Sequence, residues 1–485
     1  MASLTTPLLP GENATSKKIL SFWDGVALTL GIQIGSGIFV SPALVARNTG
    51  SEPASLVVWV VAGLLAWACA ACYAEMGTRI PVNGGPQEYV AYCFGDFFGF
   101  LTSWGCIFGV KPCSAAILAL FIADYVCDAA DIGYKLPVAL AVIALVTAVN
   151  CIGNRLSNVS TKILLACKII SVGFVIVAGF AVLLFPRISP PPLDDPPTNA
   201  RLGSGNYTDA LVAAMWACSG WEVLGFVGGD LKNPSRNFPR VMNTSMTIVI
   251  VLTLFANIAY FSALGFDGVA RSTTVGLTFS EHFLGRAGSI LYAVAICLSS
   301  LGTLNAKTFA AGRLTQAAAE RGYLPLMMKT VATKAKDDDE DEELMELPGS
   351  QSPFGFLRRP VSVGDGSIPL SAIIFNSMIS TAFVVAGDIS SLISFMGIIE
   401  YSVVFLTLMG LLWLRLKPTP SAEEDGGQLI IKVHFILIPI ALFTVASIVG
   451  ISTVRHWHAG VGFVICCVTS GLVYRLFVRK VGVTQ

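Results

Sequence analysis

The sequence predicts an all-helical membrane protein with about twelve transmembrane helices. Hydrophobic residues make up 54% of its 485 residues and charged residues only 13%, against about 25% charged residues in a typical soluble domain. Mean hydropathy is +0.71. Apolar stretches recur along the chain, and each is close to the roughly 20 residues that a spanning helix needs. The net charge of zero argues against a nucleic-acid partner and leaves the lipid bilayer as the expected environment.

The chain divides into two groups of helices around one acidic loop. A cytosolic tail (1–20) precedes eight helices within 21–330, and the acidic cytosolic loop (331–366) leads to four more within 367–480 and a cytosolic end at 481–485. The third helix is long enough to be tilted or bent. The candidate helices are 22–47, 54–78, 88–126, 134–153, 158–185, 208–230, 239–264, 287–313, 368–387, 390–414, 432–453 and 457–478.

The basic residues set the predicted orientation. With the N-terminus in the cytosol, the cytosolic segments hold 21 Lys and Arg residues and the outer segments hold seven. The positive-inside rule therefore predicts that both termini are cytosolic. The outer segment 186–207 carries the sequon Asn206-Tyr207-Thr208, which makes Asn206 a candidate for glycosylation. We expect the plasma membrane, although an internal membrane would satisfy the same charge pattern.

Two candidate helices contain glycine clusters near the middle of the membrane. The first reads Gly31-Ile32-Gln33-Ile34-Gly35-Ser36-Gly37, and the sixth reads Trp216-Ala217-Cys218-Ser219-Gly220-Trp221-Glu222. A glycine costs about 1 kcal/mol in a helix interior, so three within seven residues predict a break. Breaks five helices apart predict two inverted five-helix repeats with helices one and six unwound, followed by two C-terminal helices.

An unwound segment in lipid needs partners, because an unpaired backbone N–H or C=O costs several kcal/mol there. N–H groups after a break lie at the positive end of a half-helix and suit a carboxylate. Carbonyls before the break suit an ammonium, so a ligand with both groups is favoured. The alternative is that Gly35, Gly37 and Gly220 only allow close helix packing, and the glycines alone leave both interpretations open.

The residues around these breaks resemble the L-type amino-acid transporters of the amino acid–polyamine–organocation superfamily. The resemblance extends over roughly 20–480. Its motifs are Gly35-Ser36-Gly37-Ile38-Phe39-Val40-Ser41-Pro42, Cys72-Tyr73-Ala74-Glu75-Met76-Gly77, Thr147-Ala148-Val149-Asn150-Cys151, Asn233-Pro234-Ser235-Arg236-Asn237-Phe238-Pro239, Leu304-Asn305, Arg313 and Trp413-Leu414-Arg415.

The resemblance implies roles for residues at both breaks. The amides of Ser36 and Gly37 would bind the substrate carboxylate, and the carbonyls of Gln33, Trp216 and Ser219 would bind its amino group. Trp216 also matches the position of an aromatic gate that closes over the substrate from outside. Ile34, Gly35 and Gly220 complete the two unwound segments as expected substrate contacts.

Lys168 in the fifth helix matches a lysine of the family. Its ammonium would occupy the place where sodium-coupled relatives bind a cation, so sodium coupling is not expected. The alternative is a lysine that extends to the cytosolic face.

Other charged residues depart from the pattern of the large-neutral transporters. Glu222 and Glu400 stand where several of them carry asparagine, and Lys307 replaces a small polar residue. Lys111 matches a basic family position, and Tyr401 stands where an aromatic pocket residue is common. Since intramembrane charges are usually functional, three interpretations stay open: an acid binds a cationic side chain, an acid carries a coupling proton, or the acids pair with Lys307 or Lys111 as structural ion pairs.

The function we predict is secondary active transport of L-amino acids by alternating access, with large neutral substrates including methionine and leucine. A proton-coupled or cationic amino-acid permease is the alternative within this class, and a non-transporting amino-acid sensor is the alternative outside it. No catalytic constellation, cofactor or metal site is expected. Cys127 lies close to where family light chains carry the cysteine that bonds a heavy-chain glycoprotein, but its flanking residues match poorly, and we favour an unpaired cysteine.

Overall fold

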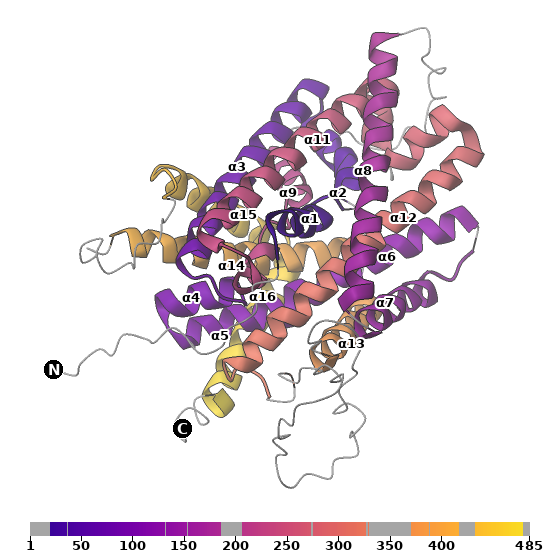
Figure 1. Cartoon of the computed structure of the whole chain (residues 1–485). Coiled ribbons are helices and arrows are strands. Elements are labelled where there is room, and N and C mark those ends of the chain that lie inside the picture. The colour runs from indigo at the N-terminus through magenta and orange to yellow at the C-terminus, as the bar shows by residue number, and fades with distance from the viewer. Residues whose placement is uncertain are drawn as a thin grey trace, which may run out of the picture.

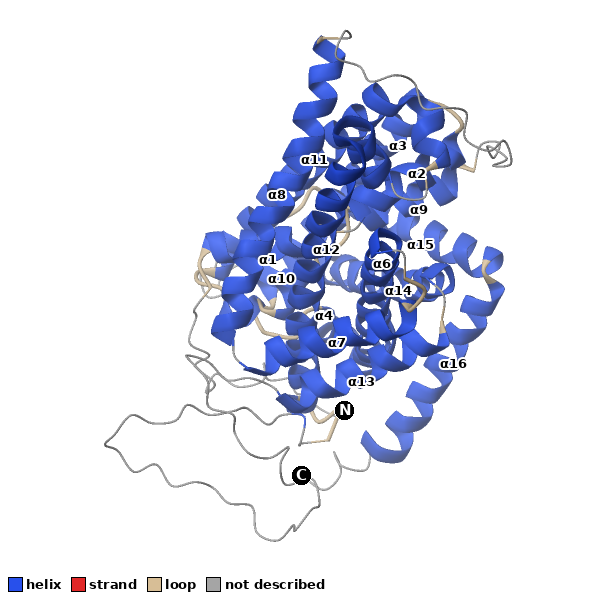
Figure 2. Ribbon diagram, turned by 90° about the vertical axis from the view of Figure 1, so that its right-hand side faces the viewer, coloured by secondary structure: helices blue, strands red, loops and turns tan. Residues whose placement is uncertain are grey.

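The structure is a computed structural model, and it describes residues 20–35, 37–130, 132–152, 154–185, 206–272, 275–325, 328, 370–387, 389–416 and 432–478. Helices make up nearly all of this part of the chain, and no strand occurs in it (Figure 2). Two isolated backbone bridges join Leu20 to Leu231 and Asn83 to Val227. The predicted acidic loop at 331–366, the tail before residue 20 and Ser36 lie outside the described residues.

The helices follow the predicted order. Those of the first half are α1 (Phe22–Gln33), α2 (Gly37–Thr49), α3 (Glu52–Arg79), α4 (Pro86–Phe94), α5 (Asp96–Gly105), the π-helical turn η1 (Cys106–Val110), α6 (Lys111–Ala130), α7 (Lys135–Ile152) and α8 (Asn154–Leu184). Those of the second half are α9 (Tyr207–Ala217), α10 (Val223–Phe226), the 3₁₀ turn η3 (Gly228–Asp230), α11 (Pro234–Arg271), α12 (Val275–Glu320), α13 (Leu370–Ala386), α14 (Ile389–Leu416), α15 (Leu437–Arg455), α16 (Trp457–Val473) and η6 (Tyr474–Val478).

The structure confirms the predicted fold class. Within the described residues, eight helices are long and apolar enough to cross a membrane, and α7 and α13 are shorter apolar helices. The two interrupted segments, α1–α2 and α9–α10, account for the remaining two of the predicted helices. The first and sixth predicted helices are therefore the two that are broken near their middle.

Glycines with positive φ bend three of the long segments. Gly95 (φ 89°) separates α4 from α5, so the third segment is bent, as its length allows. Gly265 (φ 68°) and Gly285 (φ 65°) bend α11 and α12. Helical residues beyond these two bends extend both helices past the predicted ends at residues 264 and 287.

The broken helices lie at the centre of the bundle. In Figure 1, α1 is seen nearly end-on among longer helices, and it contacts α8, α11 and α12. The half-helix α2 packs along α9, so the two broken segments are direct neighbours. A capping box begins α1: the Ser21 hydroxyl accepts from the Asp24 N–H at 3.3 Å, and Asp24 Oδ2 accepts from the Ser21 N–H at 3.1 Å.

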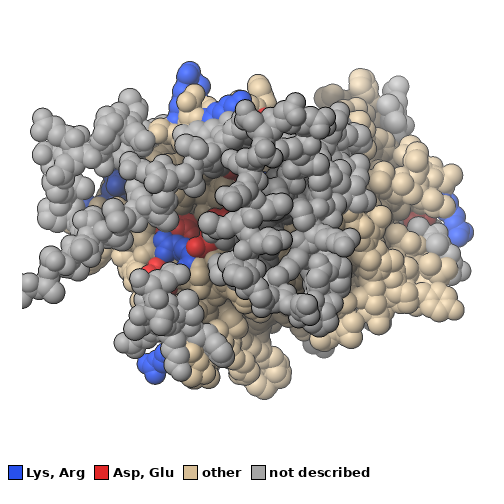
Figure 3. Space-filling view, turned by 60° about the horizontal axis from the view of Figure 1, so that its bottom comes forward, with Lys and Arg blue, Asp and Glu red and all other residues tan. Residues whose placement is uncertain are grey.

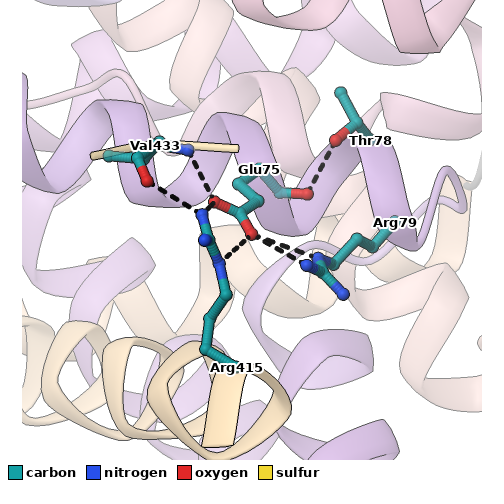
Figure 4. Close-up of polar contacts among 5 residues, drawn as sticks. All are labelled: Glu75, Thr78, Arg79, Arg415 and Val433. Carbon is teal, nitrogen blue, oxygen red and sulfur yellow. Dashed lines mark hydrogen bonds and ion pairs between the residues drawn. The ribbon is translucent and has the colours of Figure 1, made fainter. Parts of the chain in front are cut away.

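A buried carboxylate ties α3 to the far half of the chain (Figure 4). The Glu75 side chain is fully buried, and its Oε1 accepts from Arg415 Nε at 2.7 Å and from Arg79 Nη2 at 3.0 Å. Its Oε2 accepts from the Val433 N–H at 2.9 Å, and Arg415 Nη2 donates to the Val433 carbonyl, also at 2.9 Å. One acid thus fixes the ends of α3 and α14 and the segment that enters α15. We call this set of residues the Glu75 cluster.

The outer surface is mostly uncharged. Large apolar side chains are exposed on many helices, including Leu145 on α7, Val177 on α8 and Phe443 on α15. In Figure 3, the described surface that is visible between the grey atoms is mostly uncharged, and its charged side chains lie in a few separate places. Such a surface suits a lipid environment, since exposed apolar side chains there face acyl chains rather than water.

Candidate functional site: the cavity between the broken helices

The first break separates α1 from α2. The Ile34 N–H donates to the Leu30 carbonyl at 2.9 Å as the last helical bond of α1, and the Gly35 N–H turns back to the Gln33 carbonyl at 2.9 Å. The next half-helix, α2, begins at Gly37. The N–H groups in its first turn have no acceptor inside the helix, and the positive end of its dipole points into the break.

The second break follows α9. The Ser219 N–H and hydroxyl both donate to the Trp216 carbonyl, at 3.1 and 2.8 Å. Gly220 then adopts φ 107°, in the left-handed region that favours glycine. The chain resumes as the short helix α10. Although the Trp216 carbonyl has these partners, a carbonyl oxygen has two lone pairs and can also accept from a ligand.

The two breaks touch each other through their glycines. A Cβ on Gly37 would lie 2.8 Å from the Cα of Ala217, and a Cβ on Gly220 would lie 2.7 Å from Ile32 Cγ2. Glycine is therefore needed here for close backbone approach, as the packing interpretation requires. This packing also brings the end of α1, the start of α2 and the end of α9 to one place, as a binding site would require.

A cavity of about 30 Å³ lies at this place, which is room for a water molecule but little more. Its lining residues come from the two breaks, from α6 and from α12: Ile32, Gln33, Gly35, Gly37, Ser114, Ile117, Leu118, Trp216, Ala217, Ser219, Thr303 and Lys307. Gln33 is 3% exposed, and its Oε1 is a buried acceptor without a hydrogen-bond partner in the described structure. A ligand ammonium would satisfy it.

The predicted substrate-binding residues occupy two positions relative to this cavity. Gln33, Gly35, Gly37, Trp216 and Ser219 line it. Other predicted contacts lie near the breaks or behind them and are not among the lining residues. These are Ile34, Gly220, Glu222, Glu400 and Tyr401.

Lys168 of α8 binds the first break directly. Its side chain is buried, with 1% of the residue exposed. Its Nζ donates to the Gly31 carbonyl and, at 2.5 Å, to Thr303 Oγ1. The ammonium thus supplies the charge that a bound cation would otherwise bring to this carbonyl. Its contacts lie inside the protein and not at a membrane face.

The four remaining intramembrane charges lie together. Glu222 Oε2 accepts from the Gly220 N–H at 3.0 Å, and Glu222 Oε1 lies 3.5 Å from Lys111 Nζ. The Lys111 ammonium also sits over the Phe226 ring, 4.2 Å from its centroid, a favourable cation–π geometry. Glu400 interacts electrostatically with Glu222, Lys111 and Lys307. The structure therefore pairs Glu222 with protein groups, as the ion-pair interpretation expects.

One side of the site is closed by backbone contacts. The Leu20 N–H donates to the Asp230 carbonyl and the Lys232 N–H donates to the Leu20 carbonyl, both at 2.9 Å. Asn83 Oδ1 accepts from the Gly229 N–H at 2.9 Å. These bonds join the start of α1 and the α3–α4 connection to the segment after α10. These contacts hold the three segments together in this structure.

Sequence reasoning did not identify the α6 and α12 residues Ser114, Ile117, Leu118 and Thr303 as lining the cavity. Thr303 precedes Lys307 by four residues, so both lie on one face of a helix. That spacing is the signal by which Thr303 could have been found. On α6, Lys111 precedes Ser114 by three residues and Leu118 by seven, so this intramembrane lysine was the corresponding signal for one face of α6.

Two further predicted residues lie away from the cavity. Asn206, the candidate for glycosylation, is half-buried before α9, and its side-chain amide donates to Asp209. Cys127, the candidate for a disulfide with a partner, is only 2% exposed. Among the described residues, no group of three or more His, Cys, Asp and Glu side chains could hold a metal ion.

Comparison with known proteins identifies the class of this chain. The family model described as "Amino acid permease" matches residues 20–471, so the chain belongs to the amino acid permease family and is a transporter rather than an enzyme. It is 28% identical over 475 residues to the human b(0,+)-type amino acid transporter 1, covering 96% of this chain and 89% of that protein. It is 29% identical over 441 residues to the rabbit large neutral amino acids transporter small subunit 2, covering 88% and 75%.

Proposed function

We propose that this chain is a secondary active transporter of L-amino acids and that its substrates are large neutral amino acids, a class that includes methionine and leucine. The contact between the two breaks around one cavity carries this proposal. The first turn of α2 offers N–H groups for a carboxylate, and Gln33 offers a buried acceptor for an ammonium. Both groups occur in every free amino acid, so the breaks would recognise the class and not the side chain.

The transport cycle we propose alternates the access to this cavity. Trp216 lines the cavity from α9 and would close over the substrate from outside. The hydrogen bonds that Leu20 and Asn83 make to the segment after α10 would form the cytosolic seal. Inward opening would then require α1 and α10 to rock away from the surrounding helices and break these bonds. This assignment places both termini in the cytosol, as the basic residues favour, and we propose the plasma membrane as the location.

Lys168 supports transport without sodium. Its ammonium binds the Gly31 carbonyl and Thr303. A fixed positive charge therefore already lies at the carbonyl end of α1, where a sodium ion would otherwise be needed. We expect uptake to be unchanged when choline replaces sodium in the external medium. A strict sodium requirement would contradict the role of Lys168 proposed here.

Proton coupling through Glu222 or Glu400 is the alternative to a carrier that only exchanges amino acids. Glu222 is paired with Gly220 and Lys111, which weakens its candidacy as the partner of a cationic substrate side chain. If Glu222 or Glu400 instead carries a coupling proton, changing it to Gln would abolish accumulation driven by a pH gradient and spare exchange. Unchanged pH dependence in both variants would reject proton coupling through these acids.

Uptake into proteoliposomes tests the proposed function. The purified chain should accumulate radiolabelled amino acid in a saturable way, and unlabelled amino acid inside the vesicles should accelerate entry. Binding without accumulation would favour an amino-acid sensor, and uptake without saturation would favour a channel.

Because Cys127 is buried, we expect the chain to transport alone and a Cys127→Ser variant to behave like the wild type. Activity that appears only with a disulfide-bonded partner would contradict this.

A further inference from the structure

We infer that Lys307 sets the side-chain specificity of the central site and that it selects neutral amino acids whose side chain ends in a hydrogen-bond acceptor, a carboxamide above all. The inference rests on the proposed function, because it concerns the same cavity. It goes further by naming the substrate class within the large neutral amino acids and the residue that chooses it.

The position of Lys307 places it on the side-chain wall of the cavity. The unwound segments supply Gln33, Gly37 and Ser219 to the lining, and α6 and α12 supply its helical wall. Thr303 of α12 lies against the first break, where its Oγ1 donates to the Gly31 carbonyl at 3.4 Å. Lys307 lies one helical turn further along α12 and contacts Ser114 of α6. An amino acid held by its carboxylate and ammonium at the breaks must direct its side chain toward the helical wall. That wall is apolar at Ile117 and Leu118 and polar at three residues, Ser114, Thr303 and Lys307.

Lys307 has donors that its protein contact does not use. Its Nζ donates to Ser114 Oγ, whereas a lysine ammonium carries three hydrogens and accepts none. Lys307 is half-buried at this position, and a donor that loses water without gaining an acceptor costs free energy. An acceptor at the end of the substrate side chain would remove that cost, and a purely apolar side chain would not.

The surrounding charges favour a neutral acceptor. Glu400 and Glu222 both act electrostatically on Lys307 and offset its charge, so a substrate carboxylate would meet two acids of its own sign. A cationic side chain would meet the ammonium groups of Lys307 and Lys111 and would bring no acceptor for them. Glu222, which could attract it, already accepts from the Gly220 N–H and pairs with Lys111. A carboxamide oxygen satisfies Lys307 and brings no charge.

Transport of a substrate panel by three reconstituted proteins tests this inference. The wild type should carry glutamine with a higher kcat/KM than leucine, glutamate or lysine. Lys307→Met, which keeps the length and removes the donor, should lower kcat/KM for glutamine about tenfold or more and leave leucine unchanged or improved. Lys307→Gln, whose amide still donates, should retain the preference for glutamine over leucine.

A lysine outside the site supplies the control. Lys135 is 55% exposed and pairs with Asp124 at 2.7 Å, so Lys135→Met should leave the whole panel unchanged. Three results would overturn the inference: a wild type that prefers leucine or glutamate to glutamine, a wild type that prefers lysine, or a Lys307→Met variant with an unchanged ratio of glutamine to leucine. If the wild type carries no amino acid at all, the proposed function fails as well, and this result is distinct from active transport with another preference.

Discussion

Gly37 meets two requirements that only glycine satisfies together. It starts α2, so its N–H belongs to the first turn and has no acceptor inside the helix. It also approaches Ala217 so closely that an added Cβ would lie 2.8 Å from the Ala217 Cα. The neighbouring atoms are backbone and cannot rotate away. Substitution would therefore separate the two broken segments at the cavity.

We expect Gly37→Ala to reduce amino-acid uptake by about tenfold or more, because relieving an overpacked contact costs about 1–3 kcal/mol and displaces the site. The matched control is Gly173→Ala on α8, where an added Cβ has no neighbour within 4 Å. That variant should insert and transport like the wild type. Equal uptake by the two variants, at equal amounts of protein in the membrane, would show that the close approach at Gly37 is unimportant.

Lys168 allows a second test at this scale. We expect Lys168→Met to impair transport and to lower thermal stability, because the buried Gly31 carbonyl loses its partner at a cost of about 1–3 kcal/mol. Lys135→Met serves again as the control, since its exposed ion pair with Asp124 is worth less than about 1 kcal/mol. Wild-type stability and uptake of Lys168→Met would mean that the contact with Gly31 has no role.

Residue roles could be predicted from the sequence only where a local pattern marks them. The glycines were found because a cluster of glycines is unfavourable in a helix, and the roles of Gln33, Trp216 and Ser219 came from the family resemblance. Glu222 and Glu400 were found as intramembrane charges, and pairing with Lys111 was one of the interpretations left open. The Gly220 N–H was not predicted as a partner of Glu222, because it becomes available only through the left-handed turn at Gly220. Thr303 could have been found only through its spacing from Lys307, and the sequence does not show that tertiary packing brings α6 and α12 to the same cavity.

At the scale of elements, the Glu75 cluster connects α3 to two parts of the chain that lie more than 300 residues further along the sequence. Glu75 lies on α3, Arg415 ends α14, and Val433 precedes α15. The two arginines flank one fully buried carboxylate. Breaking a buried pair by removing one partner leaves the other charge uncompensated.

We expect Glu75→Gln to lower the free energy of unfolding by about 3–5 kcal/mol, seen as a markedly lower melting temperature in detergent. Asp209→Asn is the control, because the pair of Asp209 with Arg455 is 38% and 43% exposed and worth about 1 kcal/mol or less. Similar melting temperatures for the two variants would show that the cluster contributes little to stability.

The ends of the helices depend on more than hydropathy. Each predicted apolar stretch corresponds to a helix, or to a set of consecutive helices, of the described structure. The predicted segments at 239–264 and 287–313 ended where polar residues begin, although α11 continues to Arg271 and α12 begins at Val275. Hydropathy identifies residues that can lie in the membrane, but it does not identify where a helix begins or ends. The helical segments beyond Gly265 and Gly285 were therefore not predicted.

At the scale of the whole molecule, the structure holds the cavity nearly closed. Its volume of about 30 Å³ is too small for an open vestibule, and the contacts of Leu20 and Asn83 seal one side. A carrier needs such a state between its outward-open and inward-open forms. The fold class, the number of spanning helices and the pair of breaks could all be predicted from the sequence, but the closure of the cavity depends on contacts between distant segments.

The central claim is that the two breaks bind the groups shared by all amino acids. The most direct test is an experimental structure of the chain with a transported amino acid bound. The claim predicts the substrate carboxylate at the N–H groups that begin α2 at Gly37, and the substrate ammonium at Gln33 and the end of α9. A ligand bound elsewhere, such as the larger hollow of about 460 Å³ between α13, α14 and the α15–α16 junction, with the cavity at the breaks filled by protein, would contradict it.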